Sequence, residues 1–380
     1  MKVFRRCAWA LITIVGVLLL VRTFFIRVYY VDSPSMEPTL HGAAEGGDHA
    51  LVLFGDGSGI ARGDVVVILP EGHDEPMVKR VLGLPGEKIA LRDGDVWIDG
   101  KILRTSEVLP VPIPIFEHGS HDFATDFRVP ANWSKTAIGW QVDASAIAPA
   151  DLSACSFMRL GLKDHYLAPD GTRVPGSDYV GDGMLECHVK FVTEGFVARL
   201  GLVEGGDRFE IHLRRTGDSL ASATLLRNGQ TVKEGQMPWN EGTHELRFSN
   251  VNNRLTFEGD GEILLQEDYE ENLPLGPMDP KAGTSKDSDR VYLGGHGGVG
   301  GISGIRVLRD LHYTPLGEHG VLDSVPLGPG EIFLLGDNSR ESRDGREWGP
   351  TPLSAVIGRP TSVLWPPRRL RSLLLKKFGI

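Results

Sequence analysis

The pattern of apolar and polar positions changes character three times along this chain. An uncharged, strongly apolar stretch at residues 7–21 follows three cations, Lys2, Arg5 and Arg6. Beyond it, short alternating or continuous apolar segments are separated by turns rich in glycine and proline, a pattern typical of β-strands. The pattern predicts a mainly β protein with a single apolar helix at its N-terminus.

The N-terminal apolar segment is long enough to cross a bilayer. A crossing helix needs about 20 residues, and residues 7–26 supply them if Arg22 reaches the far interface. The cations that precede the segment favour a cytoplasmic N-terminus with the rest of the chain outside. A cleavable signal peptide is the alternative. Because Val-Tyr-Tyr-Val at 28–31 stands where small residues would be needed, we expect an uncleaved anchor.

The strand pattern divides the rest of the chain into two domains. Residues 27–110 and 313–380 are predicted to form one β domain, with strands at 50–54, 64–69, 76–84, 88–91, 95–99, 331–335 and 361–364. Residues 111–312 carry strand-like segments at 185–193, 196–203, 208–215, 221–227, 244–250, 254–258 and 304–311. These predict an inserted antiparallel β-sandwich of the jelly-roll type. Within the insert, the glycine-rich run 296–301 is expected to be a surface loop.

Charge and cysteine content agree with this division. Residues 111–312 hold 29 acidic and 19 basic residues, whereas the remainder holds 21 of each. The absence of a basic stripe with interleaved aromatic residues argues against nucleic acid. Cys155 and Cys187 could pair in an extracytoplasmic domain, but two isolated cysteines more often stay free. No residue spacing indicates a zinc site, so we expect no metal or other cofactor.

The C-terminal segment 368–377 mixes five basic residues with Leu373–Leu375. It could contact anionic lipid. The alternative, which we favour, is a short basic helix with a solvated face.

Candidate chemistry lies in the stiff loop Ser-Pro-Ser-Met-Glu-Pro-Thr-Leu at 33–40, where the prolines restrict the backbone around Ser35. A serine hydroxyl needs a base to become a good nucleophile. No histidine of the flanking domain lies in a strand beside an orienting carboxylate. Lys79, in an apolar strand, can act instead because burial disfavours its charged form. Taken singly, Ser35 could equally belong to a tight turn, and Lys79 would more often be an ordinary strand-edge lysine.

Four short motifs then occur in a fixed order. They are Ser-x-Ser-Met-x-Pro-Thr-Leu at 33–40, Arg-Gly-Asp-Val-Val at 62–66, Lys-Arg-Val-x-Gly-x-Pro-Gly-Glu at 79–87, and Gly-Asp-Asn-Ser followed by Ser-x-Asp-x-Arg-x-Trp-Gly across 336–349. In this order they resemble type I signal peptidase, the bacterial leader peptidase. The resemblance covers residues 1–110 and about 313–365, and it says nothing about 111–312 beyond a weak likeness to concanavalin and laminin-G sandwiches.

The resemblance implies roles for individual residues. Ser35 would be the acylating nucleophile and Lys79 its general base, while Ser33 would join the Ser35 backbone N–H in the oxyanion hole. Ser342 would orient the lysine amine, and the pair Asp344 and Arg346 would brace the site. The chain departs from the family pattern at Pro34, at Ser-Arg-Glu 339–341, and at Gly345 and Glu347.

The resemblance also implies the substrate. An extended peptide would lie beside an edge strand, with its small side chains in shallow apolar pockets whose candidate walls are Val31, Met36, Leu40 and Val78. The expected partners are therefore the signal peptides of exported preproteins, cleaved at Ala-x-Ala sites, and the lipid bilayer. A glycan or protein ligand of the insert is a further partner that the sequence leaves open.

Together these expectations describe a serine endopeptidase with a Ser/Lys dyad, anchored by one helix in the bacterial cytoplasmic membrane with its catalytic domain outside. Two alternatives stay open. One is an envelope binding protein whose sandwich recognises glycan or protein while the peptidase core is inert. The other is a Ser/Lys protease that processes a different membrane protein.

Overall fold

The computed structural model describes residues 9, 13, 16, 25–55, 57–72, 74–104, 112–159, 161–168, 170–204, 206–270 and 291–373. The predicted apolar helix at 7–26 falls outside the described residues, except for Trp9, Thr13, Gly16, Phe25 and Ile26. No helix within the described part of the chain has the length and apolar character that a bilayer crossing requires.

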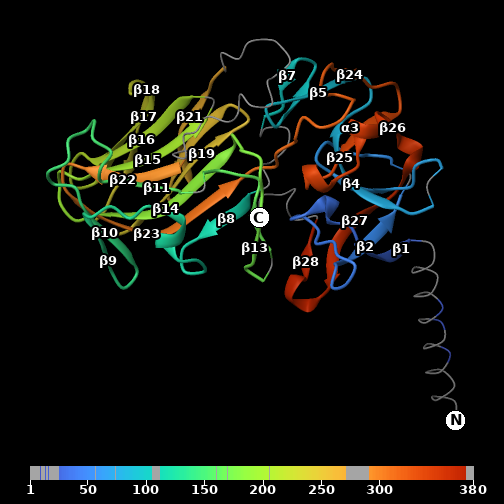
Figure 1. Ribbon diagram of the computed structural model, residues 1–380, viewed down its shortest axis with the longest axis horizontal. Helices are drawn as coiled ribbons and strands as arrows, with labels where there is room; N and C mark the ends of the chain where they lie inside the picture. Colours follow the sequence, from blue (N-terminus) through green and yellow to red (C-terminus); the bar gives the residue numbers. More distant parts are fainter. Residues whose placement is uncertain are drawn as a thin grey trace. The chain divides into compact units, whose positions relative to one another are not determined.

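The chain forms two compact units, coloured along the sequence in Figure 1. The first unit comprises Met1–Leu103, Glu107–Leu109 and Tyr313–Ile380, and the second comprises Arg104–Ser106 and Pro110–His312. The first unit is therefore made mainly of two long chain segments, which the second unit separates in sequence.

The described residues of the first unit form two antiparallel sheets. The larger has the order β1-β2-β27-β3-β4-β25-β26, with β28 paired to β27. Its strands are β1 (Ile26–Tyr30), β2 (His49–Phe54), β3 (Val65–Ile68), β4 (Met77–Gly83), β25 (Glu331–Leu335), β26 (Thr351–Pro352), β27 (Val356–Trp365) and β28 (Arg371–Ser372). The smaller sheet has the order β24-β5-β6-β7, formed by β24 (Val325–Pro326), β5 (Lys88–Arg92), β6 (Asp95–Ile98) and β7 (Lys101–Ile102).

Strand β4 is central to the larger sheet. It pairs with β3 on one side, where Lys79 lies opposite Val66, and with β25 on the other. Apolar side chains of β3, β4 and β25, among them Val66, Val81 and Leu334, form one buried cluster. Because β25 comes from the far side of the insert in sequence, the sheet places the segment after residue 331 beside the strand that carries Lys79.

Short helical turns complete the first unit. They are α3 (Gly345–Trp348) and the 3₁₀ turns Pro34–Met36, Ser339–Glu341, Leu353–Ala355 and Pro367–Arg369. Figure 1 shows α3 beside β25, at the end where this strand leads into the following loop. The loop that carries Ser35 and the loop that carries Arg346 are thus both attached to the larger sheet.

The second unit contains two larger antiparallel sheets and a two-stranded one. One has the order β21-β20-β19-β14-β23-β10-β9 with β8 paired to β23, and the other has the order β11-β22-β15-β16-β17-β18. The strands of the first are β8 (Ile113–Glu117), β9 (Trp133–Lys135), β10 (Gly139–Asp143), β14 (Gly183–Phe191), β19 (His244–Val251), β20 (Arg254–Gly259), β21 (Glu262–Asp268) and β23 (Val299–Arg309). Those of the second are β11 (Ser156–Phe157), β15 (Val197–Glu204), β16 (Asp207–Arg215), β17 (Leu220–Arg227), β18 (Gln230–Pro238) and β22 (Val291–His296). Helix α2 (Phe123–Asp126) and the pair β12 (Tyr166–Leu167) and β13 (Arg173–Val174) lie outside these two sheets.

A single buried cluster joins the two sheets of the second unit. Leu185 and Val307 contribute to it from one sheet, and Leu200 and Ile211 from the other. Alternating residues of the facing strands therefore meet in one core, as in a β-sandwich. The prediction of a mainly β protein is confirmed.

The glycine-rich run 296–301 differs from the prediction of a surface loop. Its ends belong to β22 and β23. A Cβ at Gly300 would come within 2.1 Å of the Phe196 ring, and one at Gly295 within 2.3 Å of the same ring. Glycine is needed here because the strands pack directly against a buried phenyl ring.

The described part of the C-terminal segment also differs from the expected solvated helix. It consists of the 3₁₀ turn Pro367–Arg369 followed by β28, and Arg369 is buried with its Nε 2.6 Å from Asp48 Oδ1. The remaining tail residues, 374–377, lie outside the described residues. Cys155 and Cys187 are both buried and free.

Candidate active site

The loop that carries Ser35 is held in a tight, proline-started turn. Ser33 caps the 3₁₀ turn Pro34–Met36, its Oγ accepting a hydrogen bond from Ser35 N at 3.3 Å. A Cβ at Gly42 would lie 1.7 Å from Ser33 O, so only glycine lets the returning chain pass this close. The hydroxyl of Ser35 is consequently presented from a backbone with little freedom to move.

The structure brings Ser35 and Lys79 into contact. Lys79 Nζ lies 3.0 Å from Ser35 Oγ, and both residues are buried. Burial lowers the pKa of Lys79 to about 8; the carboxylates of Asp344 and Asp337 raise it and the Arg346 guanidinium lowers it. A buried amine with a lowered pKa beside a hydroxyl is the arrangement expected of a base and its nucleophile.

Next to Lys79 on β4, Arg80 forms a buried ion pair with Asp337. Arg80 Nε lies 2.7 Å from Asp337 Oδ1, and Nη2 lies 2.5 Å from Oδ2. The following residue, Asn338, donates its backbone N–H to Ser35 O at 3.0 Å. The Gly-Asp-Asn segment is thereby attached to both the nucleophile loop and the strand of the lysine.

Asp344 and Arg346 form a second buried ion pair. Asp344 Oδ2 accepts a hydrogen bond from Gly336 N at 3.0 Å and lies 2.9 Å from Arg346 Nη2. Both charges act on the pKa of Lys79, in opposite directions. The resemblance implies a bracing role for this pair, and the contact with Gly336 suits that role.

The oxyanion and orienting candidates lie beside the dyad. The Oγ of Ser33 is the acceptor for the Ser35 N–H, so a substrate oxyanion would have to take its place. Ser342 Oγ donates to Arg343 O at 3.4 Å. It lies close to the nucleophile loop, because a Cβ at Gly336 would come within 2.1 Å of Ser342 Oγ and 2.6 Å of Ser35 O.

The four candidate pocket walls gather in one apolar cluster. Val31, Met36 and Leu40 form its buried part with Ala50 and Val363, and Val78 packs against it. Val31, Met36 and Leu40 are 6%, 1% and 0% exposed. In this structure their side chains therefore form the buried core beside the Ser35 loop.

Further contacts near the site involve residues to which the sequence assigned no role. Thr314 and Ser339 both contact Arg346, and His41 Nδ1 lies 2.7 Å from Glu37 Oε1 within the nucleophile loop. Burial raises the pKa of Glu37. Thr314 carries no local signal, whereas Ser339 lies in the Gly-Asp-Asn-Ser motif, at one of the positions where the chain departs from the family pattern.

The site residues contain no candidate metal centre. Among the residues that the structure describes, no three or more His, Cys, Asp and Glu side chains form a group that could hold a metal ion. What the arrangement offers chemically is a hydroxyl nucleophile, an amine base and backbone donors.

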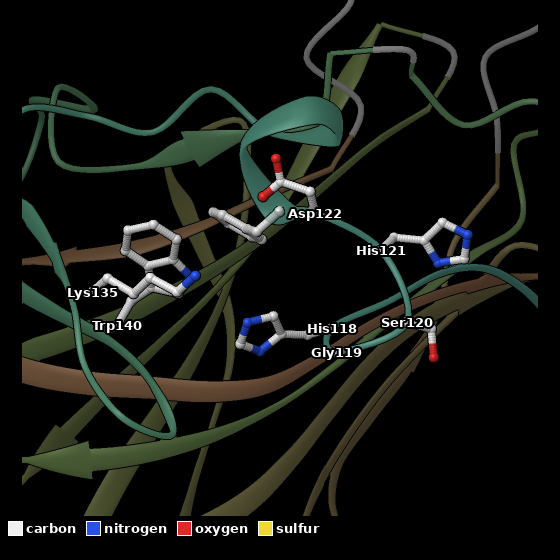
Figure 2. A pocket seen from close by; sticks show the side chains of 8 residues that line it. His118, Gly119, Ser120, His121, Asp122, Lys135 and Trp140 are labelled. Carbon is white, nitrogen blue, oxygen red and sulfur yellow. The ribbon is translucent and has the colours of Figure 1, made fainter.

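The second unit has a pocket of its own, about 340 Å³ in volume. Its lining comes from the segment after β8, the start of α2 and the β9–β10 hairpin, as Figure 2 shows. Burial and the nearby Lys135 lower the pKa of His118 there, which favours its neutral imidazole form. The ring of Phe123 lies 5.3 Å from that of Trp140. The pocket combines an aromatic wall with polar side chains and contains no residue to which the resemblance assigns a catalytic role.

Comparison with known proteins matches two segments of the chain that lie mostly in the first unit. Residues 4–112 and 307–365 fit the family model described as signal peptidase, peptidase S26. Signal peptidase I of Bacillus amyloliquefaciens is 38% identical over 95 residues, which are 24% of this chain and 49% of that protein. Signal peptidase I S of Bacillus subtilis (strain 168) is 36% identical over 96 residues, 24% of this chain and 50% of that protein. The chain spans about half the length of the curated relatives it matches.

Solved structures give weaker likenesses. The carbohydrate binding module CBM66 from Bacillus subtilis is 11% identical with a TM-score of 0.28, covering 49% of this chain and 92% of that one. Sheep galectin-11 is 15% identical with a TM-score of 0.21, covering 34% of this chain and 91% of that one. TM-scores this low do not establish a shared fold.

Proposed function

We propose that this chain, whose residues 4–112 and 307–365 match the signal peptidase family, is a membrane-bound serine endopeptidase. It removes signal peptides from exported precursors after small residues, at sites of the Ala-x-Ala type. The helix at 7–26 anchors it in the bacterial cytoplasmic membrane, and the catalytic unit acts on the extracytoplasmic side.

In the proposed reaction the neutral amine of Lys79 takes the proton of Ser35 as its Oγ attacks the scissile carbonyl carbon. The resulting ammonium group gives a proton to the leaving amine, so that the C–N bond breaks and an acyl-enzyme ester forms. A water deprotonated by Lys79 then attacks the ester, and Ser35 regains its proton. The Ser35 N–H and the Ser33 hydroxyl would stabilise the oxyanion.

The observation that carries the proposal is the contact of 3.0 Å between Lys79 Nζ and Ser35 Oγ in a buried environment. A lysine can serve as a base at neutral or mildly alkaline pH only when its pKa is lowered, and burial lowers it by disfavouring the ammonium form. The lowering of its pKa to about 8, caused first by burial, suits this role.

The test uses the full chain in detergent or vesicles with a precursor that bears an Ala-x-Ala site. Ser35→Ala and Lys79→Ala should each lower cleavage by about 10³-fold or more, because each removes a partner without which the acyl-enzyme does not form. The controls Ser354→Ala and Lys88→Ala change exposed residues of the same unit and should leave the rate unchanged. Survival of cleavage in either dyad variant would refute the proposal.

Substrate choice is tested separately. A precursor with a bulky residue at the −1 position should be cleaved poorly compared with one that carries alanine there, because small pockets exclude large side chains. If both are cleaved equally, the chain is a Ser/Lys protease for another class of membrane protein. If the wild-type chain cleaves neither, the reading as an envelope binding protein with an inert core takes precedence.

A further inference from the structure

Arg346 is held by two residues that come from separate segments of the chain. Its Nη1 donates to Thr314 O at 3.0 Å, to Thr314 Oγ1 at 2.8 Å and to Ser339 Oγ at 2.5 Å. Its Nη2 donates to Ser339 O at 2.5 Å. The side of the guanidinium that does not face Asp344 is therefore fully occupied by one threonine and one serine.

Thr314 and Ser339 are also bonded to each other. Thr314 N donates to Ser339 Oγ at 2.8 Å, and the two hydroxyl oxygens lie 3.0 Å apart. All three residues are buried, with exposures of 2% for Thr314, 7% for Ser339 and 3% for Arg346. A buried network of this kind is rigid while it is complete, and losing one member leaves polar groups without partners.

The segment that carries Thr314 is itself anchored. Tyr313 N donates to Gly94 O at 3.0 Å, while Glu318 N and His319 N both donate to Arg346 O, at 2.8 and 2.9 Å. Gly317 has a φ of +134°, and a Cβ there would come within 2.7 Å of Arg346 Cβ. Residues 313–319 therefore enclose both the backbone and the side chain of Arg346.

The position of Arg346 affects the electrostatic potential at the Lys79 amine. Arg346 Nε and Nη2 each lie 2.9 Å from one oxygen of Asp344. The facing charges are Asp344 and Asp337, which favour the ammonium form of Lys79, and Arg346, which opposes it; Asp337 is already paired with Arg80. If the guanidinium shifted away, it would neutralise Asp344 less and repel the Lys79 ammonium less. Both changes would raise the pKa of Lys79.

We propose that Thr314 is a positioning residue that holds the Arg346 guanidinium against Asp344 and thereby keeps the Lys79 amine available as a base. Its catalytic consequence rests on the proposed function. Ser339 takes part as the link between Thr314 and Arg346, at a position where the chain departs from the resemblance described above.

The test compares three variants of the full chain. Thr314→Val removes the hydroxyl, Thr314→Ser keeps it, and Thr351→Val is the matched control. Thr351 is a buried threonine of the same unit whose Oγ1 accepts a hydrogen bond from Trp348 Nε1 at 3.1 Å. We expect the ascending limb of the pH profile of kcat/KM to move to higher pH by about half to one unit in Thr314→Val. At pH values below the limb, kcat/KM should then fall by about 3- to 10-fold. At pH values above the limb, it should change little. Thr314→Ser and Thr351→Val should keep the wild-type limb.

A second readout does not depend on activity. The titration of the Lys79 amine is followed by NMR on chain labelled with ¹⁵N-lysine, the signal being assigned by its absence in Lys79→Ala. An upward shift of the Lys79 titration midpoint in Thr314→Val supports the inference, whether or not the wild-type chain cleaves a precursor. If the wild-type chain cleaves no precursor, only the proposed function is overturned.

Two results overturn the positioning role. One is an unchanged Lys79 midpoint in folded Thr314→Val. The other is a loss of activity that is equal at all pH values, since that indicates a structural role only. If Thr314→Val does not fold, Ser339→Ala breaks the same link from the other side and must give the same upward movement, and its failure to do so counts against the inference equally.

Discussion

Arg80 and Asp337, far apart in the sequence, face each other in a buried two-point ion pair, Nε to Oδ1 at 2.7 Å and Nη2 to Oδ2 at 2.5 Å. The pair joins strand β4 to the Gly-Asp-Asn segment. The same Asp337 carboxylate raises the pKa of Lys79 and so favours its charged form. The stability of the site and the state of its base are therefore connected through one contact.

This pair predicts an asymmetric mutational response. Arg80→Met should destabilise the first unit by about 3–5 kcal/mol, because it leaves the Asp337 carboxylate buried and without its cation. The double variant Arg80→Met with Asp337→Leu should recover part of that loss, since no uncompensated charge remains. Urea unfolding followed by tryptophan fluorescence measures both. Equal destabilisation of the single and double variants would contradict the assignment.

The pH dependence of the proposed reaction follows from the pKa of Lys79. The amine acts as a base only when neutral, and its pKa is lowered to about 8 by burial. We expect kcat/KM to rise about tenfold per pH unit below this value and to level off above it. A peptide with an Ala-x-Ala site provides the assay.

The same prediction has a direct control. Lys79→Arg should be inactive at every accessible pH because the guanidinium does not lose its proton, whereas Lys88→Arg, at an exposed position, should follow the wild-type profile. An ascending limb near the ordinary lysine pKa, about 10.4, would show that the base is not desolvated.

The sandwich should lose stability in mild acid because of two buried histidines. The pKa of His165 is lowered to about 4 by burial and by Arg173 and Arg309, and that of His296 is lowered to about 4 by burial and by His212 and Arg199. Between about pH 6.5 and 4 the unfolded chain therefore binds protons that the folded chain does not, so stability falls as pH falls through this window.

Each of these histidines should contribute about 2 kcal/mol to that loss. Thermal unfolding between pH 8 and about pH 4.5 measures it, and His165→Gln combined with His296→Gln should flatten the curve. Burial raises the pKa of Glu210, but the nearby His212 and the hydrogen bond from Arg199 lower it to about 2. Glu210 therefore contributes stability that is lost only below its ordinary pKa. If the stability of the double histidine variant still falls between pH 8 and about pH 4.5 as it does in the wild type, this explanation is ruled out.

The ion pair of Arg369 with Asp48 predicts that the C-terminal segment supports the nucleophile loop. Asp48 Oδ2 also accepts the backbone N–H of His41 at 2.9 Å. Arg369→Met would therefore remove the nearer of two cations from a buried carboxylate that fixes this loop, leaving Arg371 Nη2 at 3.6 Å. We expect a destabilisation of about 3 kcal/mol together with reduced cleavage. Arg368→Met, which changes the exposed neighbouring arginine, is the control and should have no effect on either measurement.

Reading the chain alone identified the residues that could react. The order of four short motifs pointed to Ser35 and Lys79, and the alternation of apolar residues predicted the strands on both sides of the insert. These features are local, because a strand pattern and a motif are each contained within about ten residues. The glycine run at 296–301 was misjudged since glycine is common in loops, and only the packing against Phe196 explains why strands contain it.

The tertiary structure alone decided which distant residues meet. Nothing in the sequence around Thr314 indicates that it contacts Arg346, and nothing around Asp48 indicates that its cation is Arg369. Periodicity states which face of a strand is buried but not which strand lies beside it. The charges that surround Lys79 come from a segment on the far side of an inserted domain, and they act on its pKa because the sheet order β3-β4-β25 brings that segment next to the lysine.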